Sequence, residues 1–134
     1  MIVRGFMLLE DGDTTEAPKV FQTALNRAKE MQNVQLQAKA NLGLASAYRE
    51  NPRMHRVAGA LFEVSASLFG AVNETSDRIN ALLEASAVYQ SIGEIDKAIS
   101  CLQRYDDRQR SIGQPPVFEA RIAELRALPK KPKG

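Results

Sequence analysis

A pattern of small and large residues recurs about every 40 positions, and this recurrence constrains the fold more than any other feature of the sequence. Three alanines lie 41 and 40 residues apart, and each is followed four positions later by a large apolar residue. These pairs are Ala17 and Phe21, Ala58 and Phe62, and Ala98 and Leu102. A second series in the same frame places a small residue three positions before a large one, at Gly5 and Leu8, Ala45 and Tyr48, and Ser86 and Tyr89. A fixed period of this length predicts a repeated supersecondary unit.

Helical periodicity of apolar residues runs through most of the chain, without the alternation that is typical of strands. Glycine, proline, asparagine and aspartate interrupt it, and the turn positions Gly12, Pro52 and Gly93 follow the same period. Aromatic residues make up only 6% of the chain and there is no tryptophan, which favours close packing of helices through small side chains. We predict six or seven helices: residues 2–11, a helix capped by Thr14 or Thr15 that ends near 31, then 36–50, 54–72, 76–92, 94–112 and 116–128.

The two series resemble the tetratricopeptide repeat (TPR), in which a small residue and then an aromatic mark the first helix of each hairpin, and an Ala followed by a Phe marks the second. The resemblance implies an all-α fold, a right-handed α-solenoid of three TPR-like helical hairpins plus a C-terminal capping helix. The TPR-like domain would span residues 1–128, with repeats of about 1–34, 35–74 and 75–114 and a capping helix over 116–128. The repeats are longer than the common TPR period of about 34 residues. Residues 129–134 are predicted to form a flexible basic tail.

Charge and cysteine content exclude several classes of function. The formal net charge is only +2 and part of it lies in the terminal PKKPKG, so we expect no binding to nucleic acid. A single cysteine, Cys101, excludes an intramolecular disulfide and a Cys-rich zinc site and indicates a reducing compartment, so we expect the protein to be cytoplasmic. The apolar run at the N-terminus is too short to span a membrane and is followed by no cleavage pattern, so we expect neither membrane insertion nor a signal peptide.

Residue types that carry catalysis or hold metals are sparse. His55 is the only histidine, and neither it nor Cys101 lies in a sequence that suggests a nucleophile–base pair. The carboxylates of the EDGD stretch, residues 10–13, lack the other ligands of a calcium loop. We read Asp106 and Arg110, four residues apart, as a pair on a solvated helix face. We therefore expect no enzyme, no cofactor and no metal site.

A groove on the first helices of the hairpins is the predicted functional site. In a TPR these helices line a concave surface that binds an extended peptide or a helix, so we expect a non-catalytic interaction scaffold. Helical phase places ten candidates there: Phe6, Leu9, Lys39, Leu42, Ser46, Arg49, Asn80, Leu83, Ala87 and Gln90. Lys39 and Arg49 would meet acidic groups, Asn80 and Gln90 would pair with a backbone, and Phe6, Leu42 and Leu83 would receive apolar anchors. Leu42 and Leu83 could equally belong to the core.

Two further expectations concern this surface. The carboxylate clamp of chaperone-binding TPRs is not expected, because Ile2 and Phe6 stand where its first Lys and Asn would be. The alternative to a scaffold is a self-assembling, homo-oligomeric segment, or a fragment of a longer TPR or SNAP-like adaptor array. The repeat frame begins at Met1, so Ile2, Val3, Phe6 and Met7 have no earlier helix to cover them.

Overall fold

The computed structural model describes residues 1–129, and within this range the chain is all-helical, as predicted. It has seven α-helices, a short 3-10 helix and no strand among these residues. The helices are α1 (Ile2–Glu10), α2 (Glu16–Glu30), α3 (Val34–Arg49), α4 (His55–Ala71), α5 (Thr75–Ser91), α6 (Ile95–Ser111) and α7 (Glu119–Arg126), with the 3-10 helix η1 (Pro52–Met54) before α4. All but Pro129 of the predicted basic tail lies outside the described residues.

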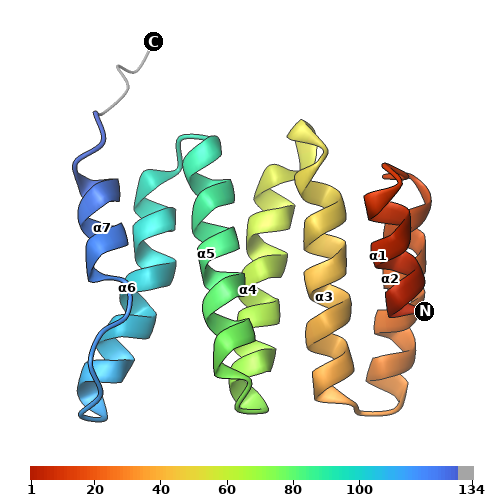
Figure 1. Cartoon of the computed structure of the whole chain (residues 1–134), viewed down its shortest axis with the longest axis horizontal. Coiled ribbons are helices and arrows are strands. Elements are labelled where there is room, and N and C mark those ends of the chain that lie inside the picture. The colour runs from red at the N-terminus through yellow and green to blue at the C-terminus, as the bar shows by residue number, and fades with distance from the viewer. Residues whose placement is uncertain (130–134) are drawn as a thin grey trace.

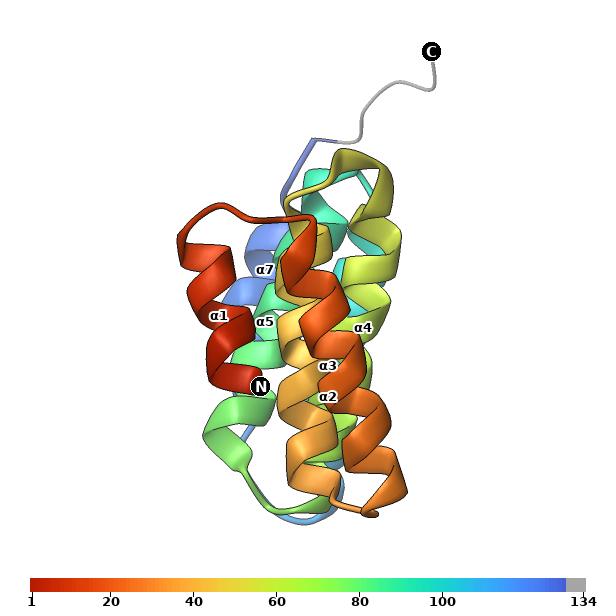
Figure 2. The same ribbon diagram turned by 90° about the vertical axis from the view of Figure 1, so that its right-hand side faces the viewer.

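The helices stand side by side in chain order along the long axis of the molecule, with α1 and α2 at one end and α7 at the other (Figure 1). Seen from the end, α1, α5 and α7 lie towards one side and α2 and α4 towards the other (Figure 2). Side-chain bridges connect every second helix: Arg49 of α3 pairs with Glu84 of α5. Glu63 of α4 likewise pairs with Arg104 of α6, with 2.6 Å between carboxylate oxygen and guanidinium nitrogen. Consecutive helices therefore pack against one another, and side-chain bridges also connect α3 with α5 and α4 with α6.

The residues of the recurrent series form the core. Ala17, Ala58 and Ala98, with Phe21, Phe62 and Leu102 four positions later, are all completely inaccessible to solvent. The small residues of the second series, Gly5, Ala45 and Ser86, are buried as well. Burying a side chain the size of Phe or Leu contributes about 1.5–3 kcal/mol, so the three large residues stabilise three successive contacts between helices. The residues that recur in the sequence thus make similar buried contacts between helices in successive parts of the chain.

Glycine is required where an aromatic ring lies directly on a helix backbone. The ring of Phe21 on α2 is so close to α1 and α3 that a Cβ atom on Gly5 would lie 2.6 Å from it, and one on Gly43 would lie 2.1 Å from it. The ring of Tyr89 on α5 lies in the same way over Gly59 of α4, 2.7 Å from the position of a Cβ atom. These contacts bring the helix axes closer than any side chain at the glycine positions would allow.

The turns follow the predicted positions, but the cap of α2 differs from the prediction. Gly12 and Gly93 both adopt a φ of +77°, a left-handed conformation that favours glycine. Thr15 occupies the cap position of α2, yet its side chain makes no capping hydrogen bond. Asp13 supplies that bond instead, because its Oδ1 accepts from the backbone N–H of Glu16 at 2.9 Å. Thr15 thus holds the predicted cap position, but the side chain that accepts the capping hydrogen bond is that of Asp13.

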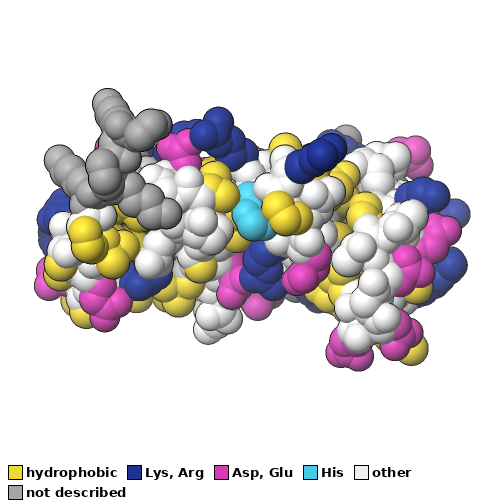
Figure 3. Space-filling view, turned by 90° about the horizontal axis from the view of Figure 1, so that it is seen from above, with side chains coloured by type: hydrophobic (Ala, Val, Ile, Leu, Met, Phe, Trp, Pro, Cys, Tyr) yellow, Lys and Arg dark blue, Asp and Glu magenta, His cyan; other side chains and the backbone are white. Residues whose placement is uncertain are grey.

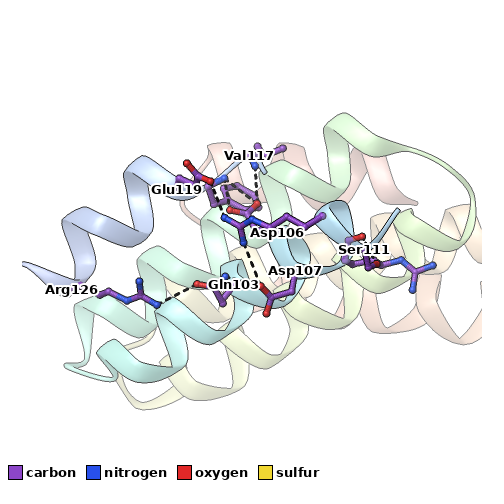
Figure 4. A network of polar contacts seen from close by, with 10 residues as sticks. Gln103, Asp106, Asp107, Ser111, Val117, Glu119 and Arg126 are labelled. Atoms are coloured by element: carbon purple, nitrogen blue, oxygen red, sulfur yellow. Dashed lines mark hydrogen bonds and ion pairs between the residues drawn. The ribbon is translucent and has the colours of Figure 1, made fainter. Parts of the chain in front are cut away.

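Asp106 is buried and attaches α7 to α6, which corrects its predicted place on a solvated helix face. Its side chain points from α6 towards the segment before α7, where it accepts hydrogen bonds from the backbone N–H groups of Val117 at 2.7 Å and Phe118 at 3.0 Å (Figure 4). Arg110 pairs with Asp107 and Glu119 rather than with Asp106. A carboxylate can be buried when it accepts several hydrogen bonds, so Asp106 serves as a structural anchor.

Candidate partner-binding face

The predicted groove residues of α3 and α5 occupy equivalent positions in consecutive repeats. A shift of 41 residues converts Lys39, Leu42, Ser46 and Arg49 of α3 into Asn80, Leu83, Ala87 and Gln90 of α5. The spacing within each set keeps its four members on one face of the helix. We call these eight residues and the side chains that bridge them the odd-helix face.

Two side-chain bridges show that this face continues from α3 through α5 to α7. Arg49 of α3 pairs with Glu84 of α5. Gln90, which is equivalent to Arg49 in the repeat, accepts a hydrogen bond through its side-chain oxygen from the guanidinium group of Arg121 on α7. This position therefore connects α3 to α5 through a donor, Arg49, and α5 to α7 through an acceptor, Gln90.

Four of the predicted residues are exposed: Lys39, Asn80, Leu83 and Ala87. Within residues 1–129 the side chains of Lys39 and Asn80 make no hydrogen bond or ion pair. Leu83 is 37% exposed and lies outside the core, contrary to the alternative that it is simply a core residue. A partner could reach these side chains without breaking an internal contact.

The other polar members of the face already have partners within the protein. Besides its pairing with Glu84, the guanidinium carbon of Arg49 lies 5.5 Å from the centroid of the Phe62 ring. Ser46 donates its hydroxyl hydrogen to the carbonyl oxygen of Leu42 at 2.8 Å. A ligand carboxylate at Arg49 would therefore have to compete with Glu84, and a ligand backbone at Gln90 would have to compete with Arg121.

The apolar candidates are divided between core and surface. Leu42 is partly buried and packs against the main core, so the alternative assignment of Leu42 to the core is supported. Phe6 and Leu9 on α1 pack against the core cluster formed by α1, α2 and α3, and the Phe6 ring meets Phe21 edge-on with 4.9 Å between centroids. Leu83 is therefore the large apolar side chain of the predicted site that is exposed to a partner.

Sequence reasoning did not find Glu84 and Arg121 as members of this face. Their pairing depends on how each helix is rotated relative to its neighbours, and no local pattern in the sequence indicates this rotation. The bridge Arg49–Glu84 joins side chains that are about 40% exposed, so it contributes only a fraction of a kcal/mol to stability.

The residues considered for catalysis have structural surroundings. The Nε2 atom of His55 lies 2.9 Å from the carbonyl oxygen of Arg49, at the start of α4. Burial, aided by the negative charge of Glu63, raises the pKa of the Cys101 thiol to about 12. In residues 1–129 no three His, Cys, Asp or Glu side chains come together in a way that could hold a metal ion. Over the same range no helix has the length and apolar character needed to cross a membrane.

Charged side chains of both signs are interspersed at the end of the molecule that carries the α1–α2, α3–α4 and α5–α6 turns (Figure 3). Lys and Arg side chains alternate there with Asp and Glu side chains, and this view shows no extended area of one sign. Neighbouring charges of opposite sign largely cancel at a distance. Dissolved salt also screens exposed charges beyond about 8–10 Å at physiological ionic strength, so the electric field at this end is short-ranged. Recognition at this end would therefore depend on individual side chains.

Comparisons of the chain with protein-family models, with curated protein sequences and with solved structures find no match. The class that its own residues define is an all-helical protein whose consecutive helices pack in chain order.

Proposed function

We propose that this chain is a TPR-like α-solenoid that acts as a non-catalytic scaffold and binds a peptide or helix of a partner protein across the odd-helix face. The observation that supports the proposal is the pair of bridges at equivalent positions, which join α3 to α5 through Arg49 and α5 to α7 through Gln90. Buried packing at a period of about 40 residues supports the proposed solenoid, since stacked hairpins require such contacts.

The chemistry of the exposed residues favours a partner with an acidic group next to an apolar side chain. Among the described residues, the side chain of Lys39 has no internal partner, whereas Arg49 is paired with Glu84. Lys39 is therefore the cation of this face that is free to bind an acidic group. Leu83 offers an apolar contact, and Asn80 can donate to and accept from a partner backbone. A partner carboxylate would pair with Lys39 while its apolar side chain covers Leu83, in a reducing, cytoplasmic setting as the single cysteine suggests.

The test is capture of partners by the protein and by two double variants. Lys39→Glu with Leu83→Gln alters the odd-helix face, and Lys29→Glu with Val57→Gln makes the same chemical changes on α2 and α4. All four side chains are exposed, with Leu83 at 37% and Val57 at 42%, so both variants should keep the melting temperature of the parent. A protein held by the parent and the α2/α4 variant but lost by the odd-helix variant would be a partner of this face. Equal retention by both variants would refute the site.

Self-assembly is the second candidate function, and the surface of α1 favours it. Val3 is 73% exposed and Met7 is 58% exposed, one turn apart on the same side of the helix. Adjacent exposed apolar side chains gain free energy when a second copy covers them. Light scattering over a range of concentrations tests this, with Met7→Glu as the variant, since Phe6 contacts Phe21 and its replacement would disturb the core. A mass that stays monomeric at every concentration would rule it out.

A further inference from the structure

A hollow of about 580 Å³ opens between α4, α5 and α6, which are consecutive in the row of helices (Figure 1). Its apolar wall includes Val64 of α4, Leu82 of α5 and Tyr105 of α6. None of the residues that line the hollow belongs to the odd-helix face. Binding of a ligand in the hollow would therefore be independent of the proposed function.

The charge of this hollow is strongly one-sided. Its charged lining residues are three arginines, Arg78, Arg104 and Arg108, and one glutamate, Glu63. These residues leave two net positive charges in one concave site, as many as the formal net charge of the entire chain. A concave surface of one sign concentrates ions of the opposite sign. The hollow is thus suited to an anion that carries two negative charges.

Arg78 is held in place by packing rather than by a carboxylate. Its guanidinium carbon lies 4.9 Å from the centroid of the Tyr105 ring. Gly70 is also close, because a Cβ atom at that residue would come within 3.0–3.1 Å of the guanidinium group. Within residues 1–129 the Arg78 side chain makes no hydrogen bond or ion pair. A guanidinium group that is oriented in this way loses little freedom when it binds an oxyanion, and its donors match two oxygens at once.

The other two arginines lie one turn apart on α6. Arg104 and Arg108 are four residues apart, so their side chains project from the same face of the helix and repel each other by a few tenths of a kcal/mol. Glu63 accepts from Arg104 and from the hydroxyl group of Tyr89, which directs part of the Arg104 guanidinium group towards α4. Arg108 is exposed and has no polar partner in the described part of the chain. An anion in the hollow would relieve the repulsion and supply the missing acceptor.

We infer that the hollow between α4, α5 and α6 binds a phosphate monoester, which Arg78, Arg104 and Arg108 hold while Val64, Leu82 and Tyr105 contact the group that carries the phosphate. A phosphate monoester fits the charge because it carries about 1.5–2 negative charges near neutral pH. Its oxygens also match the paired donors of guanidinium groups. A volume of about 580 Å³ is within the range of pockets that bind small ligands.

Calorimetric titration at constant ionic strength, set with NaCl, tests this inference with two probes. One is inorganic phosphate, and the other is a short phosphoserine peptide measured beside its unphosphorylated form. We expect saturable binding of both phosphate-bearing probes and none of the unphosphorylated peptide. A phosphopeptide that binds more tightly than inorganic phosphate would identify a protein-borne phosphate as the ligand, and equal affinity would identify a free phosphate-bearing molecule.

Arg108→Gln locates the site, and Arg27→Gln, which removes an exposed arginine from α2, is the matched control. Because Arg108 has no internal partner in the described residues, its replacement should leave the circular dichroism spectrum and the melting temperature unchanged. The association constant should fall by about tenfold in Arg108→Gln and stay at the parent value in Arg27→Gln, as expected for the loss of one charge-assisted contact. The inference is overturned if neither phosphate-bearing probe binds, if Arg108→Gln binds like the parent, or if both variants lose affinity equally.

Discussion

Replacement of Asp106 by alanine should detach α7 from the rest of the protein. The Asp106 carboxylate is inaccessible to solvent and accepts the backbone N–H groups of Val117 at 2.7 Å and Phe118 at 3.0 Å. A hydrogen bond to a charged group contributes about 1.5–3 kcal/mol. Val117 is exposed, so its N–H group can bond to water in the variant, whereas Phe118 is buried and its N–H group would be left without an acceptor. We therefore expect a loss of about 2–4 kcal/mol.

The loss should be concentrated in α7. This helix has only eight residues, too few to remain helical in water without tertiary contacts. Its attachment depends on the buried side chains of Phe118, Ile122 and Leu125, and the Phe118 ring meets Tyr105 edge-on with 5.4 Å between centroids. Without the bonds to Asp106, the segment that positions Phe118 is no longer held, so these apolar contacts should open together.

Hydrogen exchange read by mass spectrometry, combined with urea unfolding, distinguishes local detachment from general destabilisation. In Asp106→Ala the amides of residues 117–126 should exchange much faster, while those of α3 and α4 change little. Asp107→Ala is the control, because Asp107 is exposed and accepts only surface hydrogen bonds, from Gln103 at 2.9 Å and Arg110 at 3.4 Å. It should cost less than about 1 kcal/mol. If the two variants unfold alike and α7 exchanges equally in both, then Asp106 is not the anchor.

Two further perturbations test the core. Gly43→Ala should lower the free energy of unfolding by about 1–3 kcal/mol, because the new methyl group would lie 2.1 Å from the Phe21 ring. Adding Phe21→Leu should recover part of this loss. A melting temperature equal to that of the parent would contradict this packing. The thiol of Cys101, whose pKa burial raises from 9.0 to about 12, should resist iodoacetamide at pH 8 until the protein unfolds. The unfolded chain releases the thiol proton at a lower pH than the folded chain, so the free energy of unfolding should fall as the pH rises from 9 towards 12. Rapid alkylation of the folded protein at pH 8 would argue against the burial of Cys101.

The fold could be predicted from the sequence to the extent that it follows from the recurrent series. Ala58 and Phe62 are four residues apart on one helix face, and their counterparts in the other repeats are equally buried, because a period in apolar residues is a direct record of the side chains that must be hidden from water. Asp106 could not be placed in this way. Its partners, Val117 and Phe118, follow a chain reversal, and the distance across that reversal depends on how α7 returns against α6.

The exposure of some candidate residues could be predicted from the sequence, but their contacts could not. Helical phase places Lys39 and Asn80 correctly on exposed surface, since phase depends only on spacing within a helix. The bridge of Arg49 to Glu84 depends in addition on the tilt and rotation between α3 and α5, which arise from the packing of the whole row of helices. The sequence alone therefore does not distinguish an exposed residue without an internal partner from one whose side chain pairs with a neighbouring helix.

The equivalence of α3 and α5 distinguishes the residues of the odd-helix face that have internal partners from those that stay exposed. Arg49 and Gln90 stand at the same repeat position, and each is engaged by the next odd-numbered helix, so this position serves to align the stack. Lys39 and Asn80 also share a position, but there the side chain changes from a cation to a neutral amide and stays exposed. A side chain that is already paired within the protein is less available to a partner than one that is exposed and unpaired. If this face binds a partner, as we propose, selectivity would come from the exposed position that differs, and an acidic group would be preferred beside Lys39 and a neutral one beside Asn80.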